Sequence, residues 1–136
     1  MNKALEFGIQ CMTSRMVSEG DAVMFDIDDT LLRTDGTPIP EMVQLFNACK
    51  VLGYETVIIT ARPPGKQNVR YTTEQLDMNG IKADKLVFSR ASHKTMAKEL
   101  LRLNFVLSVG DQDTDIMGSQ HYIKLPDLVD KNIYTY

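Results

Sequence analysis

The chain lacks the features that define several broad protein classes. No apolar run approaches the roughly 18 residues of a membrane-spanning helix, and the N-terminus has no apolar signal-peptide core. The formal net charge is −3 and there is no basic run, since Lys94, Lys98 and Arg102 have the spacing of one helix face. We therefore expect a cytoplasmic protein without a membrane partner, and nucleic-acid binding is not expected from its charge.

Cysteine is scarce, and repeats and low-complexity stretches are absent. Cys11 and Cys49 lie in helical patterns, and in a cytosolic chain we expect both to be reduced. The 136 residues, 43% hydrophobic and 24% charged, suffice for one core and leave little room for a second. The sequence thus predicts a single domain over residues 1–136.

Helical and strand-like patterns alternate along the chain. Short apolar runs bounded by turn residues predict strands at 22–25, 57–59, 86–88, 105–109 and 122–125. Apolar residues at helical spacing predict an N-terminal helix over residues 1–20 and helices from Pro40 to a C-cap at Gly53, over 68–79, and over 92–103 with Ser92 as N-cap. This alternation predicts an α/β fold, a doubly wound, Rossmann-like parallel sheet of about five strands with helices on both faces.

Polar residues follow three of these strands. Asp26 and Asp28 come after the first, Thr60 closes the second, and Asp111 comes after the fourth. Ligands of open α/β sheets bind at the carboxyl ends of the strands, so we expect these side chains to converge. Residues i and i+2 point the same way, so both early carboxylates are expected to face one ligand. Such close carboxylates require a cation, for which Mg²⁺ is the natural choice.

These residue types match the needs of phosphate ester hydrolysis, which requires a nucleophile, an acid and charge neutralisation. Asp26 is the candidate nucleophile, and Asp28 the candidate general acid and base. Thr60 is expected to donate a hydrogen bond to a phosphoryl oxygen, and Lys94 to neutralise its charge. Asp115 is expected to help hold the metal or Lys94.

The segment 26–30, Asp-Ile-Asp-Asp-Thr, resembles the first motif of haloacid dehalogenase superfamily phosphatases. Thr60, Lys94 and the segment 110–115 resemble the later motifs in order, so the resemblance spans roughly residues 21–128. Three short segments are similar to the plant-type acid phosphatase and vegetative storage protein group. They are 60–63, the Gly-Asp-Gln at 110–112 and the Lys-Leu-Pro at 124–126.

The resemblance implies a magnesium-dependent phosphomonoester phosphatase that forms an aspartyl-phosphate on Asp26. It implies a mobile flap over residues 31–40, next to the Asp-Gly turn signal at 35–36. The implied metal ligands are Asp26, the backbone carbonyl of Asp28, and Asp111. The implied phosphate-binding residues are Thr60, Ala61, Arg62 and Lys94, with Thr30 and Asp115 in support.

The spacing between motifs leaves no room for a cap domain, because a helix and a strand fill each interval. An open site fits a macromolecular substrate, or a small one covered by another subunit of a homo-oligomer. The alternatives are a phosphotransferase, a protein or nucleic-acid-end phosphatase, and a non-catalytic binding or storage relative. Whether Arg62 and Arg70 contact substrate is open. A calcium loop starting at Asp26 is excluded by Leu31 and Thr37.

Overall fold

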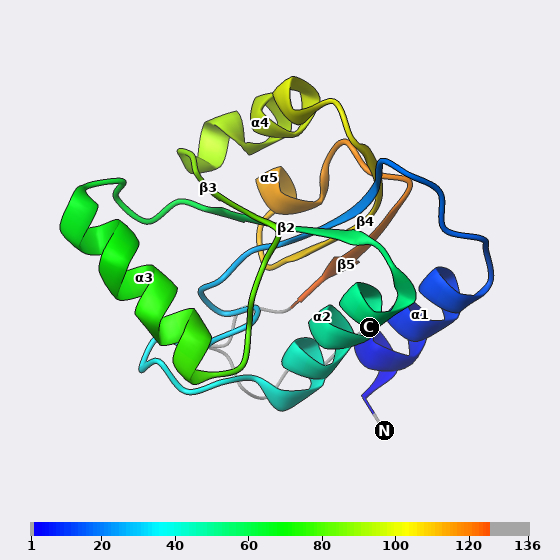
Figure 1. Cartoon of the computed structure of the whole chain (residues 1–136), viewed down its shortest axis with the longest axis horizontal. Coiled ribbons are helices and arrows are strands. Elements are labelled where there is room, and N and C mark those ends of the chain that lie inside the picture. Colours follow the sequence, from blue (N-terminus) through cyan, green and yellow to red (C-terminus); the bar gives the residue numbers. More distant parts are fainter. Residues whose placement is uncertain (1, 126–136) are drawn as a thin grey trace.

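A parallel sheet forms the central layer of the molecule (Figure 1). The computed structural model describes residues 2–125, in which five strands pair in the order β3-β2-β1-β4-β5. The strands are β1 Asp21–Phe25, β2 Glu55–Thr60, β3 Lys85–Phe88, β4 Asn104–Gly110 and β5 His121–Lys124. The predicted α/β fold is confirmed, and within these residues no cap domain is inserted between strands. Pro126 of the Lys-Leu-Pro segment lies outside the described residues.

Helices cover both faces of this sheet. One apolar cluster receives side chains from α1, α2 and α3, and a second, on the opposite face, receives them from α4. Figure 1 shows α4 and α5 above the sheet and α1 and α2 below it. The helices are α1 Lys3–Thr13, α2 Pro40–Leu52, α3 Lys66–Met78, α4 Lys94–Leu101 and α5 Asp113–Ile116, with a 3₁₀ turn at Ala91–His93. Across residues 2–125, no helix has the length and apolar character needed to cross a bilayer.

Strand β1 is buried on both of its faces. Val23 and Phe25 belong to the cluster that includes α1 and α2, and Ala22 and Met24 to the cluster that includes α4. The alternation follows because successive strand residues point to opposite faces. A strand that is apolar on both sides requires an interior position, so Asp26, the next residue, emerges at the carboxyl end of the central strand.

Several helix ends differ from the predictions, and α3 begins earlier than expected, at Lys66. Helix α1 ends at Thr13 instead of reaching residue 20, and Met16, predicted on its apolar face, is 89% exposed. Helix α4 begins at Lys94 because residues 91–93 form a 3₁₀ turn, and Ser92 does not cap it. The predicted C-cap Gly53 is confirmed, since its φ of 102° lies in the left-handed region that favours glycine.

Asp21 holds the loop that follows α1. Its carboxylate accepts hydrogen bonds from Asn104 Nδ2 at 2.9 Å, from the Ser18 backbone N–H at 2.8 Å and from Arg15 Nη1 at 2.9 Å. These contacts direct residues 14–20 into β1 and away from a longer helix. The hydrogen bonds from Asn104, Ser18 and Arg15 lower the pKa of Asp21 to about 2.

Replacing Asp21 with asparagine should lower the free energy of unfolding at pH 7 by about 1–2 kcal/mol, because a charged acceptor of three hydrogen bonds is lost. The folded-state pKa is depressed, so this stabilisation is present above the unfolded value near 4 and is lost as the pH falls through about 2. Urea unfolding between pH 2 and 6 should therefore show a shallower pH dependence for Asp21→Asn. The exposed Asp77→Asn is the matched control, and equal slopes for both variants would contradict the assignment.

Residues 31–40, the predicted flap, form a turn beside the end of β1. Leu32 pairs with Asp28 on one side and with Pro38 on the other. Gly36 has a φ of 89°, which the predicted Asp-Gly turn supplies at little conformational cost. The tip of this turn approaches α3, because a Cβ atom at Gly36 would lie 2.8 Å from Gln75 Nε2.

Candidate active site

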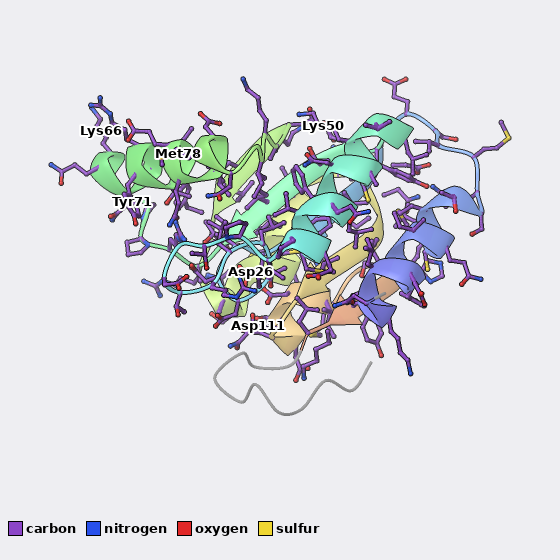
Figure 2. All side chains as sticks on the ribbon, turned by 90° about the horizontal axis from the view of Figure 1, so that it is seen from below. Asp26, Lys50, Lys66, Tyr71, Met78 and Asp111 are labelled. Carbon is purple, nitrogen blue, oxygen red and sulfur yellow. The ribbon has the colours of Figure 1, made fainter. Side chains whose placement is uncertain are left out.

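A pocket of about 330 Å³ lies at the carboxyl end of the sheet. The chain leaves β1 toward β2 on one side, and β4 pairs with β1 on the other, so the pocket lies at the point where the strand order reverses. Figure 2 shows Asp26 and Asp111 near each other at this end. The pocket is lined by Asp26, Asp28, Asp29, Ala61, Arg62, Ala91, Lys94, Asp111 and Gln112.

Asp26 continues the pairing of the central strand by one residue, since its backbone N–H donates to the Val109 carbonyl at 3.0 Å. This bond directs the Asp26 carboxylate into the pocket, where Oδ1 accepts a hydrogen bond from Lys94 Nζ at 2.9 Å. Asp26 is 7% exposed. Burial raises the pKa of Asp26 to about 7, with Asp115 adding to the rise and Lys94 opposing it.

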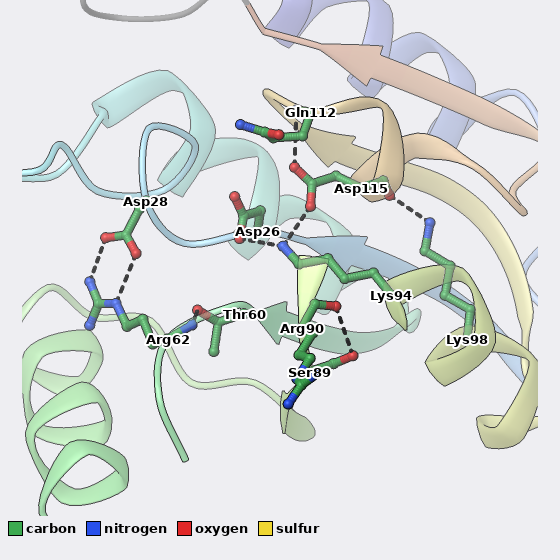
Figure 3. Close-up of polar contacts among 10 residues, drawn as sticks. All are labelled: Asp26, Asp28, Thr60, Arg62, Ser89, Arg90, Lys94, Lys98, Gln112 and Asp115. Atoms are coloured by element: carbon green, nitrogen blue, oxygen red, sulfur yellow. Dashed lines mark hydrogen bonds and ion pairs between the residues drawn. The ribbon is translucent and has the colours of Figure 1, made fainter. Parts of the chain in front are cut away.

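Lys94 is the first residue of α4 and is buried between two carboxylates (Figure 3). Its Nζ donates to Asp26 Oδ1 at 2.9 Å and to Asp115 Oδ1 at 2.6 Å. Burial alone would lower the pKa of Lys94, but the two carboxylates outweigh it and the pKa is raised. Lys94 therefore carries a positive charge beside Asp26 at neutral pH.

Asp115 reaches this lysine from α5, behind the pocket. The residue is fully buried, and its Oδ2 accepts a hydrogen bond from the Gln112 backbone N–H at 3.1 Å. The approach depends on Gly110, where a Cβ atom would collide with the Asp115 carboxyl group. Glycine at this strand end is thus required by the packing of Asp115.

Asp28 lines the same pocket, but its carboxylate is held on the side away from Lys94 (Figure 3). Arg62 grips it with two hydrogen bonds, Nε to Oδ2 at 3.0 Å and Nη2 to Oδ1 at 2.7 Å. Asp26 and Asp28 thus line one pocket, as their i, i+2 spacing predicts, but their carboxylates have different partners, Lys94 and Arg62.

Lys98, predicted only to share a helix face with Lys94 and Arg102, is buried in the structure. It is 2% exposed and donates to Ser108 Oγ at 2.9 Å and to the carbonyls of Asp115 and Met117, both at 2.6 Å. These bonds fasten the segment that carries Asp115. Burial lowers the pKa of Lys98 to about 8. Its spacing of four residues from Lys94 is the only sequence signal that could have found it.

The remaining predicted residues lie at different depths. Thr60 is 1% exposed, does not line the pocket, and accepts a hydrogen bond from the Arg62 backbone N–H at 3.2 Å. Thr30 is fully buried, and its hydroxyl has no hydrogen-bond partner among residues 2–125. Arg70 is 83% exposed, pairs with Glu74 at 3.1 Å, and does not line the pocket. Asp29, Ala91 and Gln112 line the pocket without having been predicted to do so.

Three acids are close enough to share a cation. Carboxylate oxygens of Asp26, Asp111 and Asp115 all lie within 4.8 Å of one another. Burial, with repulsion from Asp115, raises the pKa of Asp111 to about 6. Both oxygens of Asp115 already accept hydrogen bonds, from Lys94 and Gln112, which leaves Asp26 and Asp111 to offer oxygens to a metal. Hard oxygen donors of this kind suit Mg²⁺.

Comparison with known proteins identifies the family of this chain. The search of curated proteins found no match. Residues 33–131 match the family described as HAD superfamily, subfamily IIIB (acid phosphatase), a range that contains Thr60, Lys94 and Asp111 and begins after Asp26 and Asp28. The match covers most of the 136 residues and agrees with the parallel α/β fold. The chain therefore belongs to the HAD superfamily acid phosphatases of subfamily IIIB, and it is a hydrolase of phosphomonoesters.

Proposed function

We propose that the chain is a magnesium-dependent phosphomonoester phosphatase that forms an aspartyl-phosphate on Asp26. The observation that carries this proposal is the buried Lys94, which contacts Asp26 and Asp115 beside an open, acid-lined pocket. Burying the charged group of a lysine costs free energy unless partners of opposite charge offset that cost. Here Lys94 directs one carboxylate oxygen and lowers the negative charge that an incoming phosphate dianion meets.

In the first half of the reaction, Asp26 attacks the phosphorus. Lys94 binds Oδ1, so Oδ2 is the oxygen left to form the new O–P bond. As that bond forms, the bond between phosphorus and the leaving oxygen breaks. Asp28 donates its proton to the leaving oxygen and becomes a carboxylate.

In the second half, Asp28 acts as the base. Its carboxylate takes a proton from a water molecule, and the water oxygen attacks the aspartyl-phosphate, which releases inorganic phosphate and restores Asp26. We propose that Lys94, the Ala61 backbone N–H and the one Arg62 guanidinium N–H that Asp28, Thr72 and Gln75 leave unused bind phosphoryl oxygens in both halves. The Thr60 hydroxyl, predicted to bind phosphate, does not line the pocket, so we propose that it acts by orienting this segment through its bond from the Arg62 backbone N–H. Asp115 supports this arrangement through its bond to Lys94, and we propose that the fully buried Thr30 supports the segment that follows Asp28.

The donor set also fits a magnesium ion. We propose that the carboxylates of Asp26 and Asp111 and the backbone carbonyl of Asp28 hold it, while Asp115 positions Lys94. When bound, Mg²⁺ neutralises charge on the phosphoryl oxygens. Burial raises the pKa values of Asp26 and Asp111, so a bound cation would favour the charged forms of both carboxylates.

Replacing Asp111 with asparagine should weaken Mg²⁺ binding about 10- to 100-fold, because one of two available carboxylates is lost. The measurements are the Mg²⁺ concentration for half-maximal turnover and direct Mg²⁺ titration by calorimetry. Chelator should stop the wild-type enzyme, and added Mg²⁺ should restore it. Asp113→Asn is the matched control, because Asp113 is exposed and pairs with Lys124. Equal Mg²⁺ affinity for Asp111→Asn and wild type would contradict the assignment.

The open pocket leaves the substrate to experiment. Because residues 2–125 form no cap domain over it, we propose that the site accepts a phosphate on a large molecule as well as on a small one. A panel of metabolites, nucleotides, phosphopeptides and phosphorylated DNA ends should give turnover with Mg²⁺. Transfer of phosphate to an added alcohol would favour a phosphotransferase. Failure on every ester would favour a non-catalytic binding or storage role.

A further inference from the structure

We propose that Gln75 is a positioning residue for Asp28, acting through the Arg62 guanidinium and linking that pair to the tip of the flap. The inference rests on the role proposed above for Asp28. Gln75 lies on α3 and does not line the pocket, so any effect it has on the reaction must be indirect.

Arg62 is held from both sides. Its Nη1 donates to Gln75 Oε1 at 2.7 Å and to Thr72 Oγ1 at 3.2 Å, while Nε and Nη2 donate to Asp28. A guanidinium has five N–H groups, and these contacts use four of them. The hydrogen bonds to Gln75 and Thr72 of α3 therefore fix the plane of the guanidinium. That plane determines where the two hydrogen bonds from Nε and Nη2 hold the Asp28 carboxylate.

This grip matters because the Asp28 side chain is 43% exposed and would otherwise rotate into solvent. The contacts also strengthen during the reaction. When Asp28 gives its proton to the leaving oxygen, the O–H bond of Asp28 breaks and negative charge develops on the carboxylate that Arg62 grips. A contact that strengthens toward the transition state accelerates the step.

Gln75 also meets the flap. Its Nε2 lies 2.8 Å from the position that a Cβ atom at Gly36 would take. The amide oxygen of Gln75 thus accepts a hydrogen bond from Arg62, while its amide nitrogen lies next to the flap tip with no room for a side chain at Gly36. A displacement of the flap tip toward α3 would displace Gln75 and, through it, Arg62 and Asp28.

The test compares two substrates in Gln75→Leu. An alkyl phosphate needs a proton on its leaving oxygen, whereas nitrophenolate leaves without one. The quantity compared is kcat/KM, which covers only the steps up to release of the leaving group and so excludes the later role of Asp28 as base. We expect it to fall about tenfold for the alkyl phosphate, a part of the contribution typical of a general acid, and to change less than twofold for nitrophenyl phosphate. Gln67→Leu, the same change at an exposed position of α3, should affect neither substrate. A purely structural role for Gln75 would lower both rates equally and would overturn the proposal.

The flap contact has its own variant. Gly36→Ala should give the same substrate pattern as Gln75→Leu, and the double variant should be no worse than either, because both act through one contact. Gly20→Ala controls for backbone strain, since Gly20 has a similar φ of 87° with open space around it. Additive losses in the double variant would refute the link between flap and Gln75.

Asp28→Asn separates this inference from the proposed function. We expect its kcat/KM to fall far more for the alkyl than for the nitrophenyl ester. If Asp28→Asn shows that pattern and Gln75→Leu does not, the inference about Gln75 fails alone. If Asp28→Asn shows no difference between the esters, the role proposed for Asp28 fails and the inference fails with it.

Discussion

Replacing Asp26 with asparagine should reduce turnover of an aryl phosphate by at least about four orders of magnitude, because the proposed nucleophile is lost. An amide nitrogen cannot form the O–P bond, and the amide oxygen is a far weaker nucleophile. The fold should persist, since the Asp26 backbone bond to Val109 is unchanged. Initial rates with saturating Mg²⁺, together with circular dichroism, provide the measurement.

The control for Asp26→Asn is Asp77→Asn, the same change at an exposed site on α3. It should leave turnover within twofold of wild type. A trapping experiment adds a direct readout, because acid quench during turnover should leave phosphate on the wild-type protein and none on Asp26→Asn. Full activity in Asp26→Asn would rule out the covalent mechanism.

Replacing Lys94 with methionine should lower both activity and stability. The substitution removes the ammonium group that pairs with Asp26 and Asp115, which are 7% and 0% exposed. Breaking a buried ion pair in this way costs about 3–5 kcal/mol, and loss of the charge beside the phosphoryl group should reduce kcat about a thousandfold. Urea unfolding and steady-state kinetics measure the two effects. Lys66→Met, at an exposed position, should change neither.

The stability loss in Lys94→Met should depend on pH. Burial already raises the pKa of Asp26 to about 7, and removing Lys94 takes away a contact that lowers it. A folded-state pKa above the unfolded value means that the folded protein binds more protons, so the free energy of unfolding of the variant should increase as the pH falls from 8 to 5. Adding Asp115→Asn to the Lys94→Met variant should recover part of the lost free energy of unfolding without recovering activity. A pH-independent deficit would show that lost packing, and not an unpaired carboxylate, causes the instability.

Local sequence patterns were sufficient for the sheet and for the motif positions within it. Runs such as 22–25 and 57–59 are too apolar for any but interior strands, and the residues that follow them emerge at one end of a parallel sheet. Asp26, Arg62, Lys94 and Asp111 therefore line one pocket although they are far apart in the chain. Helix ends were harder to predict, because α1 stops where Asp21 captures the following loop from across the fold.

The sequence by itself determined the order of strands and helices along the chain, and which acids follow which strand. It could do so because apolar periodicity and turn residues are local properties. Only the tertiary structure decided which partner each charged group meets. Asp28 faces Arg62 because α3 holds that guanidinium through Gln75 and Thr72, and Lys98 is buried because α5 folds over it. Such pairings depend on contacts between residues distant in sequence, and on the cost of burying a charge without a partner.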